Sequence, residues 1–341
     1  MKHHSKLLLK AISNFKDIVP SRASLSILEN IKFDSKGITG TDLEISGYIP
    51  YPNLPEICVN YLELINTLKN ITGLFELTTD ENLLIFTTPS GTIKLSGMNS
   101  DEFPLIPEFK AEQKTIIPSL TGYIPFVSTN ELKPAMNGVY IGKNICATDA
   151  HRMKVSKINV DFNPSDKPFI IPTNVAKLIK EPVTCEVSDV NGKLYFENNF
   201  IVIFRLIDDR YPDYNAVIPQ DNPNHFTVLK SDLIQAINRV LPSANKSSNQ
   251  VKFTFSENEL KLHTEDIDFA RECTQVIPCN LVSGESLEIG FNGKFMLELI
   301  KQVESNEITF ELSTGNRAVV INDNTGLFLL MPVMLEKKVT A

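Results

Sequence analysis

The sequence predicts an α+β protein built from three repeated domains, because three short markers recur in one order along its 341 residues. They are a Leu-Ile pair in a helical pattern, a Thr-acid pair after an apolar run, and an apolar or aromatic residue before proline. Their positions are Leu64-Ile65, Leu178-Ile179 and Leu299-Ile300; Thr41-Asp42, Thr148-Asp149 and Thr264-Glu265; Phe103-Pro104, Tyr211-Pro212 and Met331-Pro332. Such units are far longer than solenoid repeats, so each is expected to form its own core. The expected domains are residues 1–110, 111–222 and 223–341.

Composition is typical of a soluble globular protein, with 42% hydrophobic and 22% charged residues. No run predicts a signal peptide or a membrane span, so we expect a cytoplasmic protein with no membrane partner. The five cysteines form no CxxC pair, which predicts reduced thiols rather than a zinc site or a disulfide framework. The net charge of -8 argues against indiscriminate binding of polyanions, but it is compatible with a local cationic patch.

The first helix of a domain is predicted at residues 5–15, where apolar residues follow helical spacing. Its counterpart in the third domain is residues 231–241, because the LLKAI of the first segment matches the LIQAI of the second. Ser231 or Asp232 is expected to cap that third-domain helix.

The middle domain departs from this pattern at residues 119–129. Gly122 and Pro125 fall inside the expected helix, and proline in a helix interior costs roughly 3 kcal/mol. A shortened or distorted helix is therefore expected there. Second helices are predicted in all three domains, at residues 61–71, 174–180 and 293–303.

Alternating apolar and polar residues predict strand hairpins after each second helix, with turns at the Pro, Gly and Asn clusters. These hairpins are expected at residues 83–95, 194–207 and 308–321. Each domain should therefore place two helices on one face of an antiparallel sheet.

Three such domains in a row leave a free edge at each end, and head-to-tail pairing of copies can then close a ring. With all helices facing inwards, the ring would have a helical lining. The helices carry several basic residues, which either form solvated faces or line the ring. They are Lys6, Lys10, Lys16, Lys177, Lys180, Arg239 and Lys246.

Several longer runs resemble one known family, the beta subunit of bacterial DNA polymerase III, which is a sliding clamp. The runs are MNGVYIGKNICATDAHRMKV (136–155), RLIDDRYPDYNAVIP (205–219), LFLLMPVML (327–335), RASLSILENIKF with ITGTDLEISG (22–47) and IGFNGKFMLELI (289–300). The resemblance implies a homodimeric ring around duplex DNA that tethers a replicative polymerase. It also implies three kinds of partner, namely the DNA polymerase III alpha subunit, the clamp loader and other proteins with a clamp-binding motif.

In the family a hydrophobic pocket receives a short peptide from these partners. The positions that match it here are Met136, Thr148, Ala150, His151, Arg152, Met153, Pro212, Val217, Leu329, Leu330, Met331, Pro332, Val333, Met334 and Leu335. Apolar methionine and leucine side chains suit peptide capture. The family often has Gly at position 150 and Arg at positions 216 and 334, so the more apolar rim here predicts an altered peptide preference.

The resemblance also implies DNA contacts for Lys10 and Arg22 and a hydrophobic dimer contact, and basic residues of the expected helical lining complete the DNA-facing set. The expected DNA-facing residues are Lys6, Lys10, Arg22, Lys177 and Arg239, and the expected dimer contact is Val240 with Leu241. Contacts to phosphate rather than to base edges would make the binding independent of sequence and sensitive to salt. Thr173 and Asn174 occupy positions that are often basic in the family, which predicts a weaker grip.

Two other classes of protein remain open from sequence. Asp149 and His151 could form an acid-base pair, but no nucleophile motif, phosphate loop or metal spacing accompanies them, so no enzyme, cofactor or metal is expected. Asp149 serves equally well as a turn residue. A clamp-like scaffold that binds peptides without encircling DNA is the second alternative, because the basic positions are incomplete. Stimulation of a polymerase only in the presence of DNA would separate clamp from scaffold.

Overall fold

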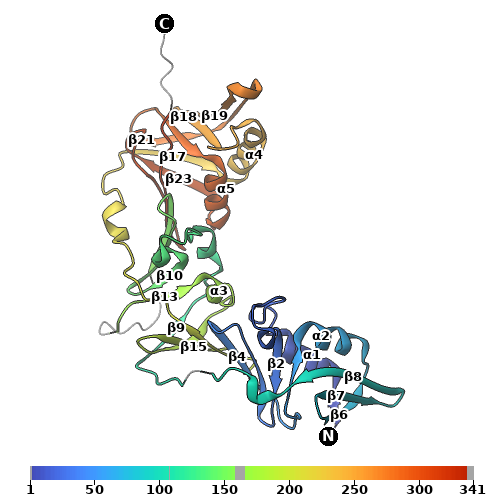
Figure 1. The fold of residues 1–341 in the computed structure, drawn as a ribbon. Helices are drawn as coiled ribbons and strands as arrows, with labels where there is room; N and C mark the ends of the chain where they lie inside the picture. The colour runs from blue at the N-terminus through green and yellow to red at the C-terminus, as the bar shows by residue number, and fades with distance from the viewer. Residues whose placement is uncertain (1, 107, 158–165, 336–341) are drawn as a thin grey trace. The chain divides into compact units, whose positions relative to one another are not determined.

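The computed structural model describes residues 2–106, 108–157 and 166–335. Every strand pair among these residues is antiparallel, which confirms the α+β class (Figure 1). No helix in this part of the chain is both long and apolar enough to cross a membrane.

The same order of elements recurs three times: a strand, a helix, a group of strands, a second helix and three more strands. The first repeat comprises β1 (Lys2–His4), α1 (Ser5–Ser13), η1 (Ser26–Glu29), β2 (Asn30–Phe33), β3 (Gly37–Thr41), β4 (Ile45–Pro50), β5 (Ile57–Asn60), α2 (Tyr61–Asn70), β6 (Leu74–Asp80), β7 (Leu83–Thr88), β8 (Gly91–Met98) and η2 (Ser100–Glu102).

The second repeat replaces its first helix by a 3-10 helix, η3. It comprises β9 (Gln113–Ile117), η3 (Thr121–Phe126), η4 (Pro134–Asn137), β10 (Gly138–Ile141), β11 (Asn144–Thr148), β12 (Arg152–Lys157), β13 (Phe169–Pro172), α3 (Thr173–Ala176), β14 (Val183–Val187), β15 (Asn191–Tyr195), β16 (Ile201–Arg205) and η5 (Tyr214–Val217). Pro125 lies inside η3. The expected distortion is confirmed, and α3 is also shorter than predicted.

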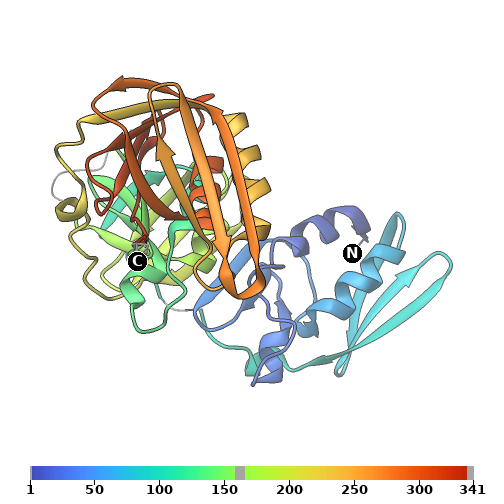
Figure 2. The ribbon, with the colours of Figure 1, turned by 90° about the horizontal axis from the view of Figure 1, so that it is seen from above.

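The third repeat has full helices again, with one extra edge strand, β21. It comprises β17 (Asn224–Leu229), α4 (Lys230–Val240), η6 (Leu241–Ser243), β18 (Gln250–Phe255), β19 (Glu259–Asp266), η7 (Ile267–Phe269), β20 (Arg271–Pro278), β21 (Asn280–Ser283), β22 (Leu287–Asn292), α5 (Gly293–Gln302), β23 (Glu307–Leu312), β24 (Val319–Asp323) and β25 (Gly326–Leu330). In Figure 2 the gold helix α4 lies beside the orange strands of its sheet.

Asparagine side chains start the second helices of the outer repeats. Asn60 Oδ1 accepts the N–H groups of the first turn of α2, and Asn292 does the same for α5. The cap predicted for α4 is wrong. The helix follows β17 directly, so Leu229 takes the cap position without a side-chain bond, and Ser231 lies inside the first turn.

The sheets run across the boundaries of the repeats. One twelve-stranded sheet has the order β1-β6-β7-β8-β5-β2-β3-β4-β16-β15-β14-β9, and a nine-stranded sheet has the order β13-β10-β11-β12-β25-β24-β23-β17-β21. The joins are β4 with β16 and β12 with β25. A four-stranded sheet, β20-β19-β18-β22, completes the third repeat.

The chain divides into two compact units, and the boundary between them falls within the middle repeat. Some strands of that repeat belong to the twelve-stranded sheet and others to the nine-stranded sheet. Unit 1 is residues 1–120 with 174–208, and unit 2 is residues 121–173 with 209–341. The division into three domains at residues 110 and 222 stays a prediction.

Phenylalanine dominates both cores. In unit 1, Phe15 after α1 meets Phe200 edge-on with ring centroids 5.2 Å apart, and a Cβ on Gly40 of β3 would lie 2.7 Å from the Phe15 ring. In unit 2, Phe255 packs against Phe226 and Phe310 at 4.8 and 5.2 Å. Burying each such ring contributes about 2–3 kcal/mol. The contacts hold the segment after α1 against the segment before β16, and β18 against β17 and β23.

The third Thr-acid marker is displaced by one residue in the structure. Thr264 Oγ1 donates to Val240 O of α4 at 3.2 Å, whereas Thr148 Oγ1 donates within its own turn to Arg152 O at 2.9 Å. The two threonines therefore point in different directions. Asp266, which pairs with Arg271 across its hairpin, takes the place of Asp149.

Each sheet of the described chain ends in two strands with one unpaired edge, namely β1 and β9, β13 and β21, and β20 and β22, and β8 has a partly unpaired edge as well. Two of these edges, those of β20 and β8, matter for the assembly of copies. β20 is the last strand of its sheet, and β8 pairs with β5 only through Gly97 and Met98. The edge of β8 at residues 91–96 is therefore open.

Candidate functional site

The hairpin between β11 and β12 ends in a turn held by Asp149. Its Oδ1 accepts the N–H groups of His151 and Arg152, each at 2.9 Å, and Ala150 N donates to Thr148 Oγ1 at 3.1 Å. Ala150 has a φ of 76°, a left-handed conformation that glycine adopts more easily. This geometry explains why glycine suits position 150.

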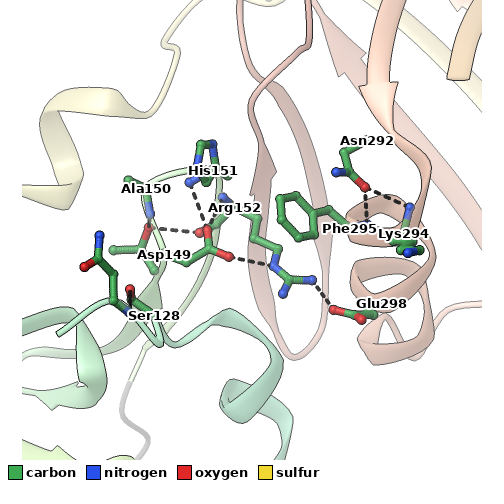
Figure 3. Close-up of polar contacts among 11 residues, drawn as sticks. Ser128, Asp149, Ala150, His151, Arg152, Asn292, Lys294, Phe295 and Glu298 are labelled. Carbon is green, nitrogen blue, oxygen red and sulfur yellow. Dashed lines mark hydrogen bonds and ion pairs between the residues drawn. The ribbon is translucent and has the colours of Figure 1, made fainter. Parts of the chain in front are cut away.

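Arg152 is buried, and its guanidinium has partners on several sides (Figure 3). Nε donates to Asp149 Oδ2 at 3.0 Å, and Nη1 forms an ion pair with Glu298 of α5. Its Cζ lies 4.3 Å from the ring centroid of Phe295 and 5.9 Å from that of Phe126. The side chain thus ties the turn to the first two turns of α5.

His151 and the segment after β25 complete the neighbourhood. The His151 ring lies 6.0 Å from Phe295 at an interplanar angle of 30°, and Met331 N donates to His151 O at 2.7 Å. Val333 N donates to Gly290 O at 2.8 Å. The backbone bonds hold this segment in place, and 39% of the surface of Met331 is exposed.

The predicted pocket residues fall into three groups by exposure. Buried are Thr148, Arg152, Met153, Leu329 and Leu330; exposed are Ala150, His151, Val217, Met331 and Met334; half-buried are Met136, Pro212, Pro332, Val333 and Leu335. The buried group supports the site from below, so a ligand would meet only the other two groups.

Strand pairing and polar contacts bring part of this set together. Arg152 pairs with Leu330 and Met153 with Leu329 across β12 and β25. Tyr214 accepts a bond from Asn144 Nδ2 at 3.2 Å, which attaches η5, and with it Val217, to β11. Among the described residues, no hydrogen bond or ring contact joins Val217 to His151.

Sequence reasoning missed Phe295 and Glu298 of α5. Both lie in the run IGFNGKFMLELI, which carried the resemblance, but in sequence they are indistinguishable from other residues of an amphipathic helix. Their role depends on contact with Arg152, which lies 146 residues before Glu298 in the chain.

A cavity of about 570 Å³ opens elsewhere in unit 2, over β18, β19 and β22. Lys252 and Glu288 form an ion pair there at 3.1 Å, which lowers the pKa of Glu288, and Leu335 adds one wall. This mixed-charge cavity differs from the apolar pocket expected for a peptide. We therefore place the candidate peptide site beside His151 and Phe295 and not in this cavity.

The acid-base alternative gains no support from the geometry. Asp149 uses Oδ1 for the turn and Oδ2 for Arg152, while the His151 ring lies tilted beside that of Phe295. Burial raises the pKa of the Cys146 thiol to about 12, so it is a poor nucleophile. The described residues contain no cluster suited to a metal ion.

The cations predicted to face DNA are all exposed, and all except Arg22 lie on a helix or directly after one. They are Lys6 and Lys10 on α1, Arg22, Lys177 after α3, and Arg239 on α4. At the predicted dimer contact, Val240 is fully buried in its own unit and Leu241 is half-buried, so only Leu241 keeps side-chain surface for a partner.

Comparisons with known proteins agree with these features. The family model for the DNA polymerase III beta subunit, C-terminal domain, matches residues 215–332. The chain is 26% identical to the beta sliding clamp of Bacillus subtilis over 96% of this chain and 97% of that protein, and 27% identical to that of Staphylococcus epidermidis.

Solved structures share the fold over nearly the whole chain. The sliding clamp of Bacillus subtilis superposes with a TM-score of 0.88 at 24% identity, covering 98% of this chain and 99% of that one. The clamp of Bartonella birtlesii bound to griselimycin also gives 0.88, at 22% identity and the same coverage. In sequence and in fold the chain is therefore similar to bacterial sliding clamps, the class that its motifs resemble. The family match lies at its C-terminal end, and the similarity to whole beta sliding clamps extends along nearly the full chain.

Proposed function

We propose that this chain is a DNA sliding clamp: two copies close head to tail around duplex DNA, and the His151 site binds short peptides of replication proteins. The ring is supported by the two places where strands of neighbouring repeats pair, β4 with β16 and β12 with β25. In the first join β16, the last strand of the second repeat, pairs with β4 of the first repeat. In the second join β25, the last strand of the third repeat, pairs with β12 of the second repeat. Both β4 and β12 follow the Thr-Asp hairpin turn of their repeat. A third such join could form between copies: β8, the last strand of the first repeat, would pair through its open edge with the open edge of β20 in the third repeat of the other copy.

The internal joins set the expected register. Gly91 and Gly326 each begin a strand after a tight loop, with φ of 149° and 145°, so Ile93 corresponds to Phe328. Arg271 corresponds to Arg152, so Cys273 corresponds to Lys154. Lys154 pairs with Phe328 in unit 2.

Cys273 is therefore expected opposite Ile93 of the second copy, and Glu272 opposite Lys94. The opposite charges of the second pair favour this register. Cys273 Sγ lies 3.7 Å from Arg239 O of α4, so it faces the helix side. Ile93 pairs with buried Phe86, which places it on the core side of its own strand.

The native cysteines allow a direct test. Cys273 is half-buried, whereas Cys58, Cys146, Cys185 and Cys279 are buried. Ile93→Cys should form an intermolecular disulfide with Cys273 on mild oxidation, which gel electrophoresis without reductant would reveal. Ile93→Cys combined with Cys273→Ser should not cross-link, and Lys94→Cys should cross-link poorly because it points to the other face. Equal cross-linking of the two single variants, or none, would contradict the proposed join.

Electrostatic contacts of the exposed helix cations would go to phosphates, and the ring itself would provide retention. Clamps loaded on nicked circular DNA should stay bound far longer than clamps on linear DNA, as measured by gel filtration of the complexes. Equal release from both forms would rule out encirclement and leave the scaffold alternative.

For the peptide site, a partner segment with Leu and Phe anchors would pack on His151, Phe295 and Met331. The Bartonella birtlesii and Pseudomonas aeruginosa clamps have been crystallised with griselimycin. We expect griselimycin to compete with a fluorescein-labelled Leu/Phe peptide for this chain. Failure of the peptide to bind the wild type would remove the proposed site.

A further inference from the structure

Two turns of this chain share one backbone but bury different side chains. Asp42 in the first repeat accepts the N–H groups of Glu44 and Ile45 at 2.9 and 2.6 Å, as Asp149 does for His151 and Arg152. Ile45, the counterpart of Arg152, is 1% exposed. An aliphatic side chain is therefore sufficient to complete this turn.

The turn alone does not explain Arg152. Removing a guanidinium from water is costly unless its donors are paired. Because isoleucine completes the same turn in the first repeat, the hairpin alone does not require a buried arginine. The partners of Arg152 show where the cation acts instead: Asp149 on the turn, and Glu298 and Phe295 on α5.

These contacts leave the guanidinium enclosed. Arg152 is 8% exposed, although the sequence predicted it as a lining residue of the pocket. The surface beside it consists of exposed His151, half-buried Phe295 and exposed Met331, which is bonded to His151 through its backbone.

We propose that Arg152 is a positioning residue of the peptide site: it sets Phe295 and the start of α5 against His151, and it does not itself contact the bound peptide. This inference rests on the proposed function of the site. Its consequence is an apolar wall for an aliphatic or aromatic anchor, with the charge of Arg152 already neutralised by Asp149 and Glu298.

The test is a double-mutant cycle on peptide affinity, measured by fluorescence anisotropy with the full chain and a fluorescein-labelled peptide that carries Leu and Phe anchors. Arg152→Ile copies the first repeat into the second, and Phe295→Ala removes the wall. We expect each change to weaken binding on the order of tenfold. The double variant should be no weaker than Phe295→Ala alone, because Arg152 acts through Phe295.

Multiplied losses in the double variant would mean that Arg152 touches the peptide independently, and an unchanged affinity in Arg152→Ile would mean that it serves the fold only. Either result overturns the inference while leaving peptide binding, and so the proposed function, intact. No binding by the wild type would instead defeat the proposed function itself.

Glu298→Gln provides a second route if Arg152→Ile fails to fold, because half of the Glu298 side chain is exposed and Arg152 keeps its bonds to Asp149. Its smaller loss of affinity should also vanish in the Phe295→Ala background. A loss that persists there would overturn the inference. An unchanged melting temperature and unchanged Ile93→Cys cross-linking would show that the fold is preserved.

Discussion

The hairpin turns at residues 41–45 and 148–152 match bond for bond. Leu43 and Ala150 have φ of 82° and 76°, and Thr41 Oγ1 and Thr148 Oγ1 each donate to the carbonyl four residues on at 2.9 Å. Even the bond from the next repeat recurs, since Arg205 N donates to Glu44 O at 3.1 Å as Met331 N donates to His151 O.

The side chains around the two turns are what differ. Ile45 fills a core position, whereas Arg152 reaches out to α5, and the helix at the first join, α3, has a single turn. One backbone thus serves as a plain joint in unit 1 and as a joint with a candidate binding wall in unit 2. Function in this molecule is carried by side chains placed on a recurring frame.

The largest expected effect separates the two aspartates. Asp149→Ala removes the acceptor for two backbone N–H groups and also a partner of a buried cation, so it should destabilise unit 2 by about 2–4 kcal/mol. Asp42→Ala loses the turn bonds alone and should cost about 1–2 kcal/mol. Urea unfolding followed by circular dichroism would measure both. Equal losses would show that Arg152 adds nothing to the second turn.

A smaller effect is expected at the matching positions where the two joining strands end, Met331 after β25 and Arg205 at the end of β16. Met331→Ala should weaken binding of the Leu/Phe peptide by about 2 kcal/mol, roughly thirtyfold, because exposed apolar anchors concentrate binding energy. Arg205→Ala, at the matching place in the first join, should leave that affinity unchanged. The melting temperature should stay close to that of the wild type in both. If Met331→Ala unfolds the third repeat or leaves affinity intact, the segment after β25 is structural and the site lies elsewhere.

The smallest effect concerns Lys154, whose counterpart two residues after Ile45 is Gly47. Lys154 is 6% exposed, with Nζ about 5 Å from the ring centroids of Tyr123 and Phe328, and burial lowers its pKa from 10.5. Between the lowered pKa and 10.5 the unfolded chain binds more protons, so stability rises with pH in that window. Lys154→Met should therefore raise the melting temperature at neutral pH, and this advantage should shrink as the pH approaches 10.5. An advantage that does not change with pH would refute the buried-charge explanation.

Local patterns predicted much of this architecture. The hairpins, the long helices and the disturbed helix around Pro125 follow from periodicity and from the chemistry of proline, which are properties of neighbouring residues. The joining of β4 to β16 was not predictable in this way, because it pairs strands about 150 residues apart in the chain.

The site shows the same limit. The turn residues were found through the family resemblance and the recurring Thr-acid marker, but the burial of Arg152 and the role of Phe295 depend on contacts between distant segments. The cap at Ser231 failed because α4 begins at Lys230, which puts Leu229 at the cap position, whereas Asn60 and Asn292 occupy that position in α2 and α5.

The discontinuous composition of unit 1 has a consequence for synthesis on the ribosome. Its twelve-stranded sheet needs β14 to β16, which emerge only after residues 121–173 of unit 2 have been made. Until β16 has been made, the edge of β4 has no partner strand, and unpaired edges of this kind can pair wrongly with other nascent chains. The nascent chain is therefore prone to aggregation while the ribosome translates the residues between β4 and β16. Slow translation of that segment should increase aggregation.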